Sequence, residues 1–270
     1  MTTRTTVHPA AKPDVERNSR EQIQSRFALG QIRWAGPLIL VAGRSILIVL
    51  AQAIFALIFL LRHHPSPWLA AAPWWTVFGT IADLGCLILL AWFTRAEGIG
   101  IRDLVGKIHL RRGHDIFAGL GWFLLVLPIF VGGGILSERL LYGPAGPNVP
   151  IGLLQARALP LWAIFYSLSL WWMIWSPTEE MTYSGYAFPR LEALFGRSWA
   201  AILVVAFFWS LQHSALPMIF DWKSTLWRFC CFLPGELVIL LIYRHTRRLP
   251  PLILAHWLMD IGGALMTLKL

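Results

Sequence analysis

Long runs of apolar residues, separated by short polar and charged segments, dominate this chain of 270 residues. Several runs approach or exceed the roughly 20 residues that an α-helix needs to cross a bilayer. The pattern therefore predicts an all-α fold, a polytopic transmembrane bundle of about seven spans. The predicted spans are residues 35–61, 73–94, 115–136, 159–188, 199–217, 229–243 and 250–268.

The polar segments divide the chain into three parts. Residues 1–33 are polar and basic, which is typical of a cytoplasmic tail. Residues 34–158 are expected to form the N-terminal transmembrane helices, and residues 159–268 the C-terminal core. Within the N-terminal part, segment 97–113 alternates apolar residues with Arg and Lys, which predicts an amphipathic helix on the membrane surface.

The composition supports a membrane protein and excludes a soluble protein and a nucleic-acid-binding protein. Hydrophobic residues make up 57% of the chain and charged residues 14%, whereas soluble domains carry about a quarter charged residues. The net charge of +9 does not indicate nucleic-acid binding, because the charges lie between the apolar runs. We expect the lipid bilayer as partner and a multi-pass location in the plasma membrane.

Basic residues also predict the orientation in the membrane. With the N-terminus inside, 16 of the 23 Lys and Arg residues fall in cytoplasmic segments. This asymmetry favours a cytoplasmic N-terminus and a C-terminus on the opposite side. The cysteines, Cys86, Cys230 and Cys231, are predicted to be three buried free thiols, because they lie in apolar surroundings, their number is odd and two of them are adjacent.

Ionisable residues within the apolar runs are functional candidates, because each is costly to place in a bilayer. Glu179 and Glu180 are the strongest, in the stretch "WSPTEEMTYSGYAFPRL". Adjacent helical residues point about 100° apart, so one carboxylate would face a site and the other a supporting partner. The alternative is that the span ends at Trp175 and that water solvates both glutamates.

Two histidines and an aspartate lie in later spans. His256 and Asp260 are four residues apart and share a helical face. His213 follows Trp209 by four residues. Each of these residues is also compatible with a role in helix packing alone. If they converge, two histidines and a carboxylate form a common set of zinc ligands, and a separate glutamate serves as the base for a water molecule.

Three further ionisable residues lie within spans. Arg44 is a counter-charge for a buried glutamate, or it pairs with Asp83. Glu236 follows Pro234 and Gly235, which break a helix and line a cavity in some membrane proteins. We leave Glu236 out of the predicted catalytic set.

The order of these elements resembles the CPBP intramembrane protease family, also called Abi. This family contains CAAX-type prenyl endopeptidases and bacterial relatives linked to bacteriocin processing or immunity. "EEMTYSGY" is similar to its E-E-x-x-x-R-G element, "WSLQH" to F-x-x-x-H and "HWLMD" to H-x-x-x-N/D. The resemblance covers roughly residues 159–268 and implies endopeptidase activity with a glutamate-activated water.

The resemblance also implies roles for individual residues. Glu179 would be the base, supported by Glu180, while His213 and His256 would hold the water or a metal. Asp260 would be a ligand or assist at the oxyanion. A divalent metal, foremost Zn²⁺, would be bound by His213, His256, Asp260 and Glu180.

Three positions differ from the residues usual in the family, and one of them is Asp260 in the third motif, where Asn is common. Ser184 replaces the arginine of the first motif, four residues after Glu180, and Trp209 replaces the usual phenylalanine of the second. Without that arginine, one buried carboxylate lacks its counter-charge, which is the basis of a non-catalytic alternative. Our first hypothesis is an endopeptidase acting on a C-terminal or juxtamembrane peptide. A non-catalytic immunity or scaffold protein is the second, and an ion-coupled transporter is the third.

Overall fold

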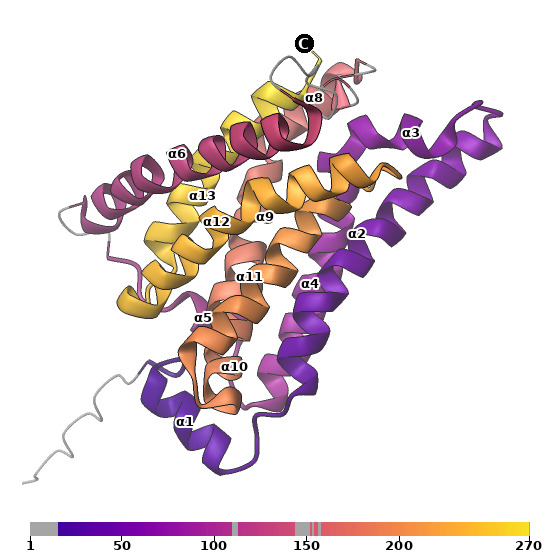
Figure 1. Ribbon diagram of the computed structural model, residues 1–270. Helices are drawn as coiled ribbons and strands as arrows, with labels where there is room; N and C mark the ends of the chain where they lie inside the picture. The colour runs from indigo at the N-terminus through magenta and orange to yellow at the C-terminus, as the bar shows by residue number, and fades with distance from the viewer. Residues whose placement is uncertain (1–15, 110–112, 144–151, 153, 156–157, 270) are drawn as a thin grey trace, which may run out of the picture.

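Helices make up the regular secondary structure of the described residues in the computed structural model, which covers 16–109, 113–143, 152, 154–155 and 158–269 (Figure 1). The chain is an all-α polytopic bundle, as the apolar pattern predicted. Its elements are α1 (Arg20–Ala28), α2 (Ala35–Leu61), α3 (Pro67–Ala71), η1 (Ala72–Trp74), α4 (Trp75–Ala96), α5 (Ile101–Val105), α6 (His114–Tyr142), α8 (Leu161–Ser169), α9 (Trp171–Glu180), η3 (Met181–Ala187), α10 (Phe188–Phe195), α11 (Ser198–Ala215), α12 (Trp222–Thr246) and α13 (Pro250–Thr267).

Five helical stretches within the described residues are long and apolar enough to cross a membrane, whereas the sequence pattern predicted seven spans. They are α2, the stretch from α3 to α4, α6, α11 and α12. Helix α13 coincides with the predicted span 250–268, but His256 and Asp260 make it more polar. The predicted span 159–188 is not a single helix.

That predicted span is divided into α8, α9, the π-helical segment η3 and the start of α10. Pro177 lies inside α9, and Pro189 lies in the first turn of α10. Because Pro189 has no N–H group, the carbonyl of Gly185, four residues earlier, loses its usual helical partner. The carbonyl of Gly185 instead accepts hydrogen bonds from Asn18 Nδ2 at 3.0 Å and Arg190 Nη1 at 3.3 Å.

Helix α9 and segment η3 lie in the middle of the bundle. Helix α9 contacts α4 and α13, while η3 contacts α2, α10 and α11 (Figure 1). Helix α6 packs against α12 and α13 at one side of the molecule. Residues near the end of α9 are therefore surrounded by helices from both halves of the chain.

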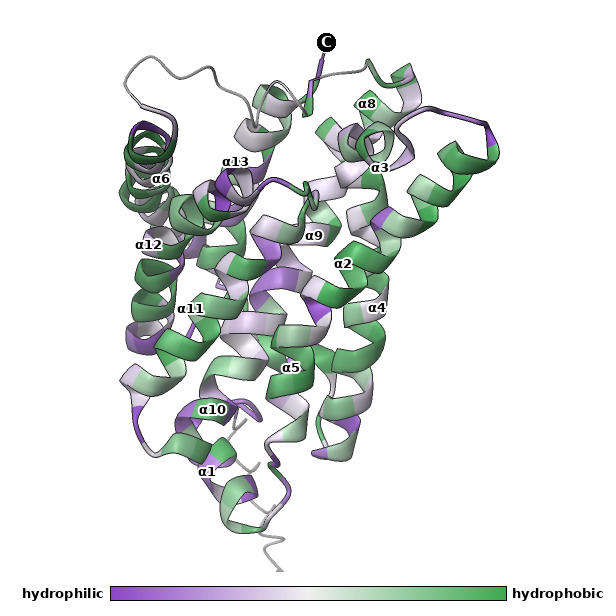
Figure 2. Ribbon diagram, turned by 45° about the vertical axis from the view of Figure 1, so that its right-hand side comes forward, coloured by the Kyte–Doolittle hydropathy of each residue, from purple (hydrophilic) through white to green (hydrophobic). Residues whose placement is uncertain are grey.

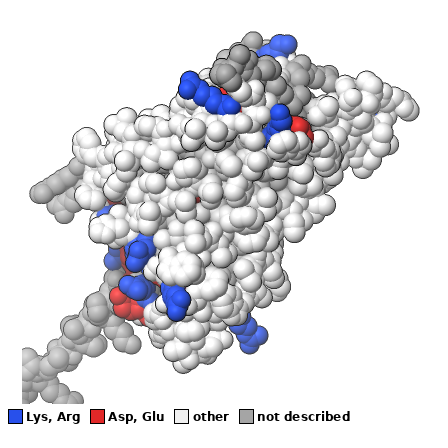
Figure 3. All heavy atoms as spheres, in the orientation of Figure 1, with Lys and Arg blue, Asp and Glu red and all other residues white. Residues whose placement is uncertain are grey.

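The surface has the character expected of an integral, multi-pass membrane protein. Hydrophobic residues cover much of the outer faces of the helices (Figure 2). Phe117, Leu124 and Leu140 of α6, for example, are 72%, 69% and 77% exposed. In the face shown in Figure 3, Lys and Arg gather toward the two ends of the molecule and leave a wide uncharged zone between them. Such a zone suits contact with lipid chains.

The predicted amphipathic helix at 97–113 is much shorter in the structure. Among the described residues of this segment, only Ile101–Val105 forms an α-helix, and Gly106 ends it with a φ of 72°. Leu104 is buried and α5 contacts η3, so one face of α5 packs on the protein. Residues 110–112 lie outside the described part of the chain. The three cysteines are free thiols, as predicted, but Cys86 is buried whereas Cys230 and Cys231 are partly exposed.

Candidate active site

Glu179 is fully buried near the end of α9 and is surrounded by polar groups from other helices. Its Oε1 accepts hydrogen bonds from Gln212 Nε2 at 2.5 Å and from Trp209 Nε1. The same oxygen lies 3.3 Å from His213 Nε2, and Oε2 lies 3.5 Å from Arg44 Nη2. The alternative of glutamates solvated at the membrane surface is therefore wrong for Glu179.

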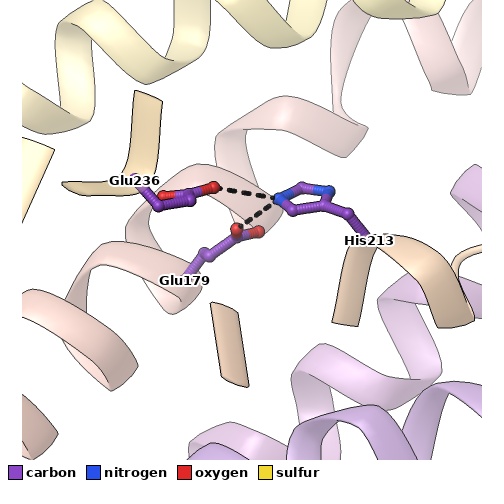
Figure 4. A group of neighbouring side chains, drawn as sticks. All are labelled: Glu179, His213 and Glu236. Carbon is purple, nitrogen blue, oxygen red and sulfur yellow. Dashed lines mark ion pairs between the residues drawn. The ribbon is translucent and has the colours of Figure 1, made fainter. Parts of the chain in front are cut away.

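His213 joins Glu179 to a second carboxylate, that of Glu236 in α12. Figure 4 shows both carboxylates directed at the same ring nitrogen, His213 Nε2, which lies 3.3 Å from Oε1 of each. The imidazole ring stacks on Phe232, with 3.7 Å between ring centroids and 7° between planes. Glu236 thus lies within the site, although sequence reasoning left it out of the catalytic set.

Glu180 is also fully buried, but it belongs to a second group of side chains. Its Oε1 lies 3.1 Å from His256 Nδ1, and its Oε2 accepts a hydrogen bond from Ser184 Oγ at 2.8 Å. His256 Nε2 lies 3.7 Å from Asp260 Oδ1, and Asp260 Oδ2 accepts a hydrogen bond from Ser176 Oγ. The side chain of Asp260 is 13% exposed, whereas that of Glu180 is not exposed at all. Within this group, solvent therefore reaches Asp260 but not Glu180.

The five predicted site residues therefore form two neighbouring groups rather than one. The first contains Glu179 and His213, and the second contains Glu180, His256 and Asp260. Trp209 lies between the groups, because it donates to Glu179 while its ring centroid is 6.3 Å from that of His256. As expected for adjacent helical residues, the two glutamates face different partners.

The geometry favours a different metal-binding set from the one implied by the family resemblance. Among the described residues, the grouping of potential ligands with all ligand atoms within 4.8 Å of one another is Glu179, His213 and Glu236. One imidazole nitrogen and two carboxylate oxygens are donors that Zn²⁺ accepts. Of the four ligands first expected, only His213 is in this grouping, because His256 and Asp260 lie with Glu180.

Arg44 provides the buried cation on the Glu179 side. Its Nη2 lies 2.8 Å from Asp83 Oδ1 and 3.5 Å from Glu179 Oε2, and its guanidinium lies 4.3 Å from the ring centroid of Trp175. The two roles considered for Arg44, pairing with Asp83 and pairing with a catalytic glutamate, are thus both present. Its glutamate partner is Glu179, however, and not the one next to Ser184.

Gln212 and Tyr183 are site residues that sequence reasoning missed. Gln212 Oε1 accepts hydrogen bonds from Arg44 Nε at 2.5 Å and from Tyr183 Oη at 3.3 Å. The ring of Tyr183 stacks on that of Trp209, with 4.9 Å between centroids. The sequence did contain a signal for Gln212, because it lies beside His213 in an apolar segment. A buried amide side chain needs hydrogen-bond partners, just as a buried histidine does.

The fold and site together define a polytopic helical membrane protein with a buried cluster of glutamates and histidines. Residues 156–262 match the sequence model of the type II CAAX prenyl endopeptidase Rce1-like family. The matched segment is less than half of the chain, and it contains all five predicted site residues. No curated protein and no solved structure matches the chain significantly.

The match supports the CPBP/CAAX protease family, as the three motifs predicted. It points to CAAX-type intramembrane protease activity. The position of each side chain comes from the structure and not from the match.

Proposed function

We propose that the protein is an intramembrane endopeptidase that hydrolyses a peptide bond with a water molecule activated by Glu179. The observation that carries the proposal is the pairing of Glu179 Oε1 with His213 Nε2 at 3.3 Å inside the bundle. A buried carboxylate beside an imidazole can hold a water molecule and accept its proton. Arg44, Gln212 and Trp209 fix the orientation of the carboxylate.

The second group would act on the substrate carbonyl and the leaving amine. Glu180 holds His256 at Nδ1, which leaves Nε2 directed toward Asp260. A positioned N–H group stabilises the oxyanion of a tetrahedral intermediate, and a protonated His256 would supply one from Nε2. The same proton would then pass to the leaving amine, while Ser176 holds Asp260 in place.

We propose that the substrate is a peptide at a C-terminus or next to a membrane span, with a prenylated C-terminus as one case. Two features support this class of substrate. The matched family is described by prenyl endopeptidase activity, and the site is enclosed by helices with apolar outer faces. We place the protein in the plasma membrane, with a cytoplasmic N-terminus.

The test compares wild type with Glu179→Gln at matched expression levels in the native host. Glutamine keeps the size of the side chain and loses its function as a base, so we expect cleavage to fall by about 10²–10⁴-fold. New protein termini across the membrane proteome are the measurement. Termini that depend on Glu179 would also identify substrates.

The matched control is Glu138→Gln, because Glu138 lies in α6 outside the site. This variant is expected to give the wild-type set of termini. Identical profiles for wild type and Glu179→Gln, with both proteins folded in the membrane, would contradict the endopeptidase. That outcome would favour the non-catalytic scaffold, for which the replacement of the family arginine by Ser184 is the supporting observation.

A further inference from the structure

A partly open cavity lies among α1, α10 and the end of α12, and none of its lining residues belongs to the two groups of the site. Its volume is about 370 Å³, and pockets that bind small ligands have volumes of about 300–1,000 Å³. The cavity is therefore large enough to hold part of a ligand between three helices. Its lining residues are Arg20, Glu192, Leu241, Arg244, His245 and Arg247.

Basic side chains dominate this lining. Arg247 is paired with Glu192. Arg20 and Arg244, by contrast, are exposed, and their side chains form no ion pair or hydrogen bond with any described residue. Even when the nearby Glu21 of α1 is counted, three arginines face two carboxylates. The cavity thus offers unpaired positive charge to an anion.

The type of basic residue favours a phosphate group as that anion. A guanidinium group presents parallel N–H donors that match two phosphate oxygens. Arg20 belongs to α1 and Arg244 to α12, so the two side chains can approach one phosphate from different helices. Lys and Arg side chains also gather at the end of the molecule that contains α1 and α10 (Figures 1 and 3).

Leu241 gives the cavity an apolar edge. It is 48% exposed, and it lies three and four residues before Arg244 and His245, so the three residues share one face of α12. Helix α12 is long and apolar enough to cross a membrane, and Leu241 lies about 4.5 Å farther from its charged end than Arg244 does. A ligand with a charged head and an apolar chain fits this order of residues.

Two simpler roles for these basic residues leave part of the arrangement unexplained. Basic residues beside membrane helices set the orientation of the chain, and those in the last turn of a helix stabilise its carboxyl end. Neither role requires a cavity, and neither brings Arg20 of α1 to the end of α12.

We propose that the cavity binds the phosphate group of an anionic phospholipid from the adjacent leaflet. Arg20 and Arg244 would hold the phosphate, and Leu241 would contact the first carbons of an acyl chain. Basic pockets at the cytoplasmic side of membrane helices bind anionic head groups in this way. The bound lipid would link α1 to the end of α12. The proposal is independent of the endopeptidase, because no residue of the site takes part in it.

The experiment measures lipid binding by the full-length protein in detergent. Native mass spectrometry counts bound phosphatidylglycerol, and phosphatidylcholine, which has no net charge, is the comparison lipid. We expect one phosphatidylglycerol per wild-type chain, bound at least about tenfold more tightly than phosphatidylcholine. The double variant Arg20→Gln with Arg244→Gln should bind phosphatidylglycerol about 25-fold more weakly, because each basic residue contributes about fivefold.

A charge-matched control is the double variant Arg95→Gln with Arg197→Gln. It removes two exposed arginines, at the end of α4 and just before α11, that do not line the cavity. This control should bind phosphatidylglycerol like wild type. Leu241→Ser keeps every charge and should still weaken binding of the lipid. The unfolding midpoint of each lipid-free variant shows that a loss of binding is not a loss of structure.

Three results would overturn the proposal. Equal binding of phosphatidylglycerol by the two double variants would place the lipid outside this cavity. Equal affinity of the wild type for both lipids would remove the role of charge. Displacement of the lipid by inorganic phosphate at the same concentration would show that the cavity binds a free anion and not a phospholipid.

Discussion

Arg44 shows how one residue from a distant helix places a cation beside a buried glutamate of the first motif. The family arginine is replaced by Ser184, whose hydroxyl donates to Glu180. The guanidinium of Arg44 instead reaches Glu179 from α2 and is also paired with Asp83. The two glutamates thus have different partners, with Arg44 beside Glu179 and His256 beside Glu180.

We predict that Arg44→Met destabilises the protein strongly. Removing one partner of a buried ion pair costs about 3–5 kcal/mol, because the remaining charge is left unpaired. Here Asp83 and Glu179 would both lose their cation in a fully buried position. Unfolding of purified protein with increasing denaturing detergent measures the change.

The matched control is Arg95→Met at the end of α4, where the side chain is exposed. Exposed substitutions usually change stability by less than about 0.5 kcal/mol. Equal unfolding midpoints for Arg44→Met and Arg95→Met would show that the buried pair contributes little. A double variant, Arg44→Met with Asp83→Leu, should recover part of the loss.

At the scale of the elements, a break in the α-helix follows the two glutamates, between α9 and α10. The π-helical segment η3 follows Glu180 directly, and single-turn π segments occur frequently at functional sites. Gly185 within it has no room for a side chain, because an added Cβ would lie 2.7 Å from Leu249 Cδ1. The small residue lets the start of α13, and with it His256, approach Glu180.

Helix α6 is held against α12 by a second close approach. A Cβ at Gly133 would lie 2.9 Å from the carbonyl oxygen of Cys231, which is backbone and cannot move aside alone. Small residues commonly allow such contacts between membrane helices. At the neighbouring Gly132, by contrast, an added Cβ would meet no atom within 4 Å.

We predict opposite outcomes for alanine at these two adjacent glycines. Gly133→Ala should destabilise the protein by about 1–3 kcal/mol, because extra volume forces α6 and α12 apart. Gly132→Ala should change stability by less than about 0.5 kcal/mol. Detergent-induced unfolding measures both, and equal effects would contradict the packing of α6 on α12.

At the scale of the whole molecule, charge and apolar surface are separated along the bundle. Helix α1 and the end of α13 lie at opposite ends of the molecule (Figure 1). Positive side chains gather near both ends, and the zone between them carries few charges (Figure 3). This arrangement agrees with a bundle that crosses a membrane, and the sequence predicts which end is cytoplasmic.

We predict that Arg197, just before α11, and Lys223, at the start of α12, lie on opposite sides of the membrane. In a variant without the three native cysteines, Lys223→Cys should react with an impermeant maleimide in intact cells. Arg197→Cys should react only after permeabilisation, because the excess of basic residues places its side in the cytoplasm. The reverse labelling pattern would invert the predicted orientation.

The apolar pattern of the sequence by itself predicted the helical fold, because length and hydrophobicity are local properties. Helix α2, for example, matches the predicted span 35–61 in both bounds. The same reasoning identified Glu179, Glu180, His213, His256 and Asp260, since an ionisable residue stands out in an apolar run. The three motifs led to the family that the match over residues 156–262 supports.

Only the tertiary structure decided how these side chains are paired. Helical periodicity places residues on a face, but it does not say which face of α2, α11 or α12 meets α9. The joining of Arg44 and Glu236 to Glu179 therefore depended on contacts between residues far apart in sequence. The break at η3 depended on such contacts as well, because Asn18 and Arg190 satisfy the carbonyl that Pro189 leaves free.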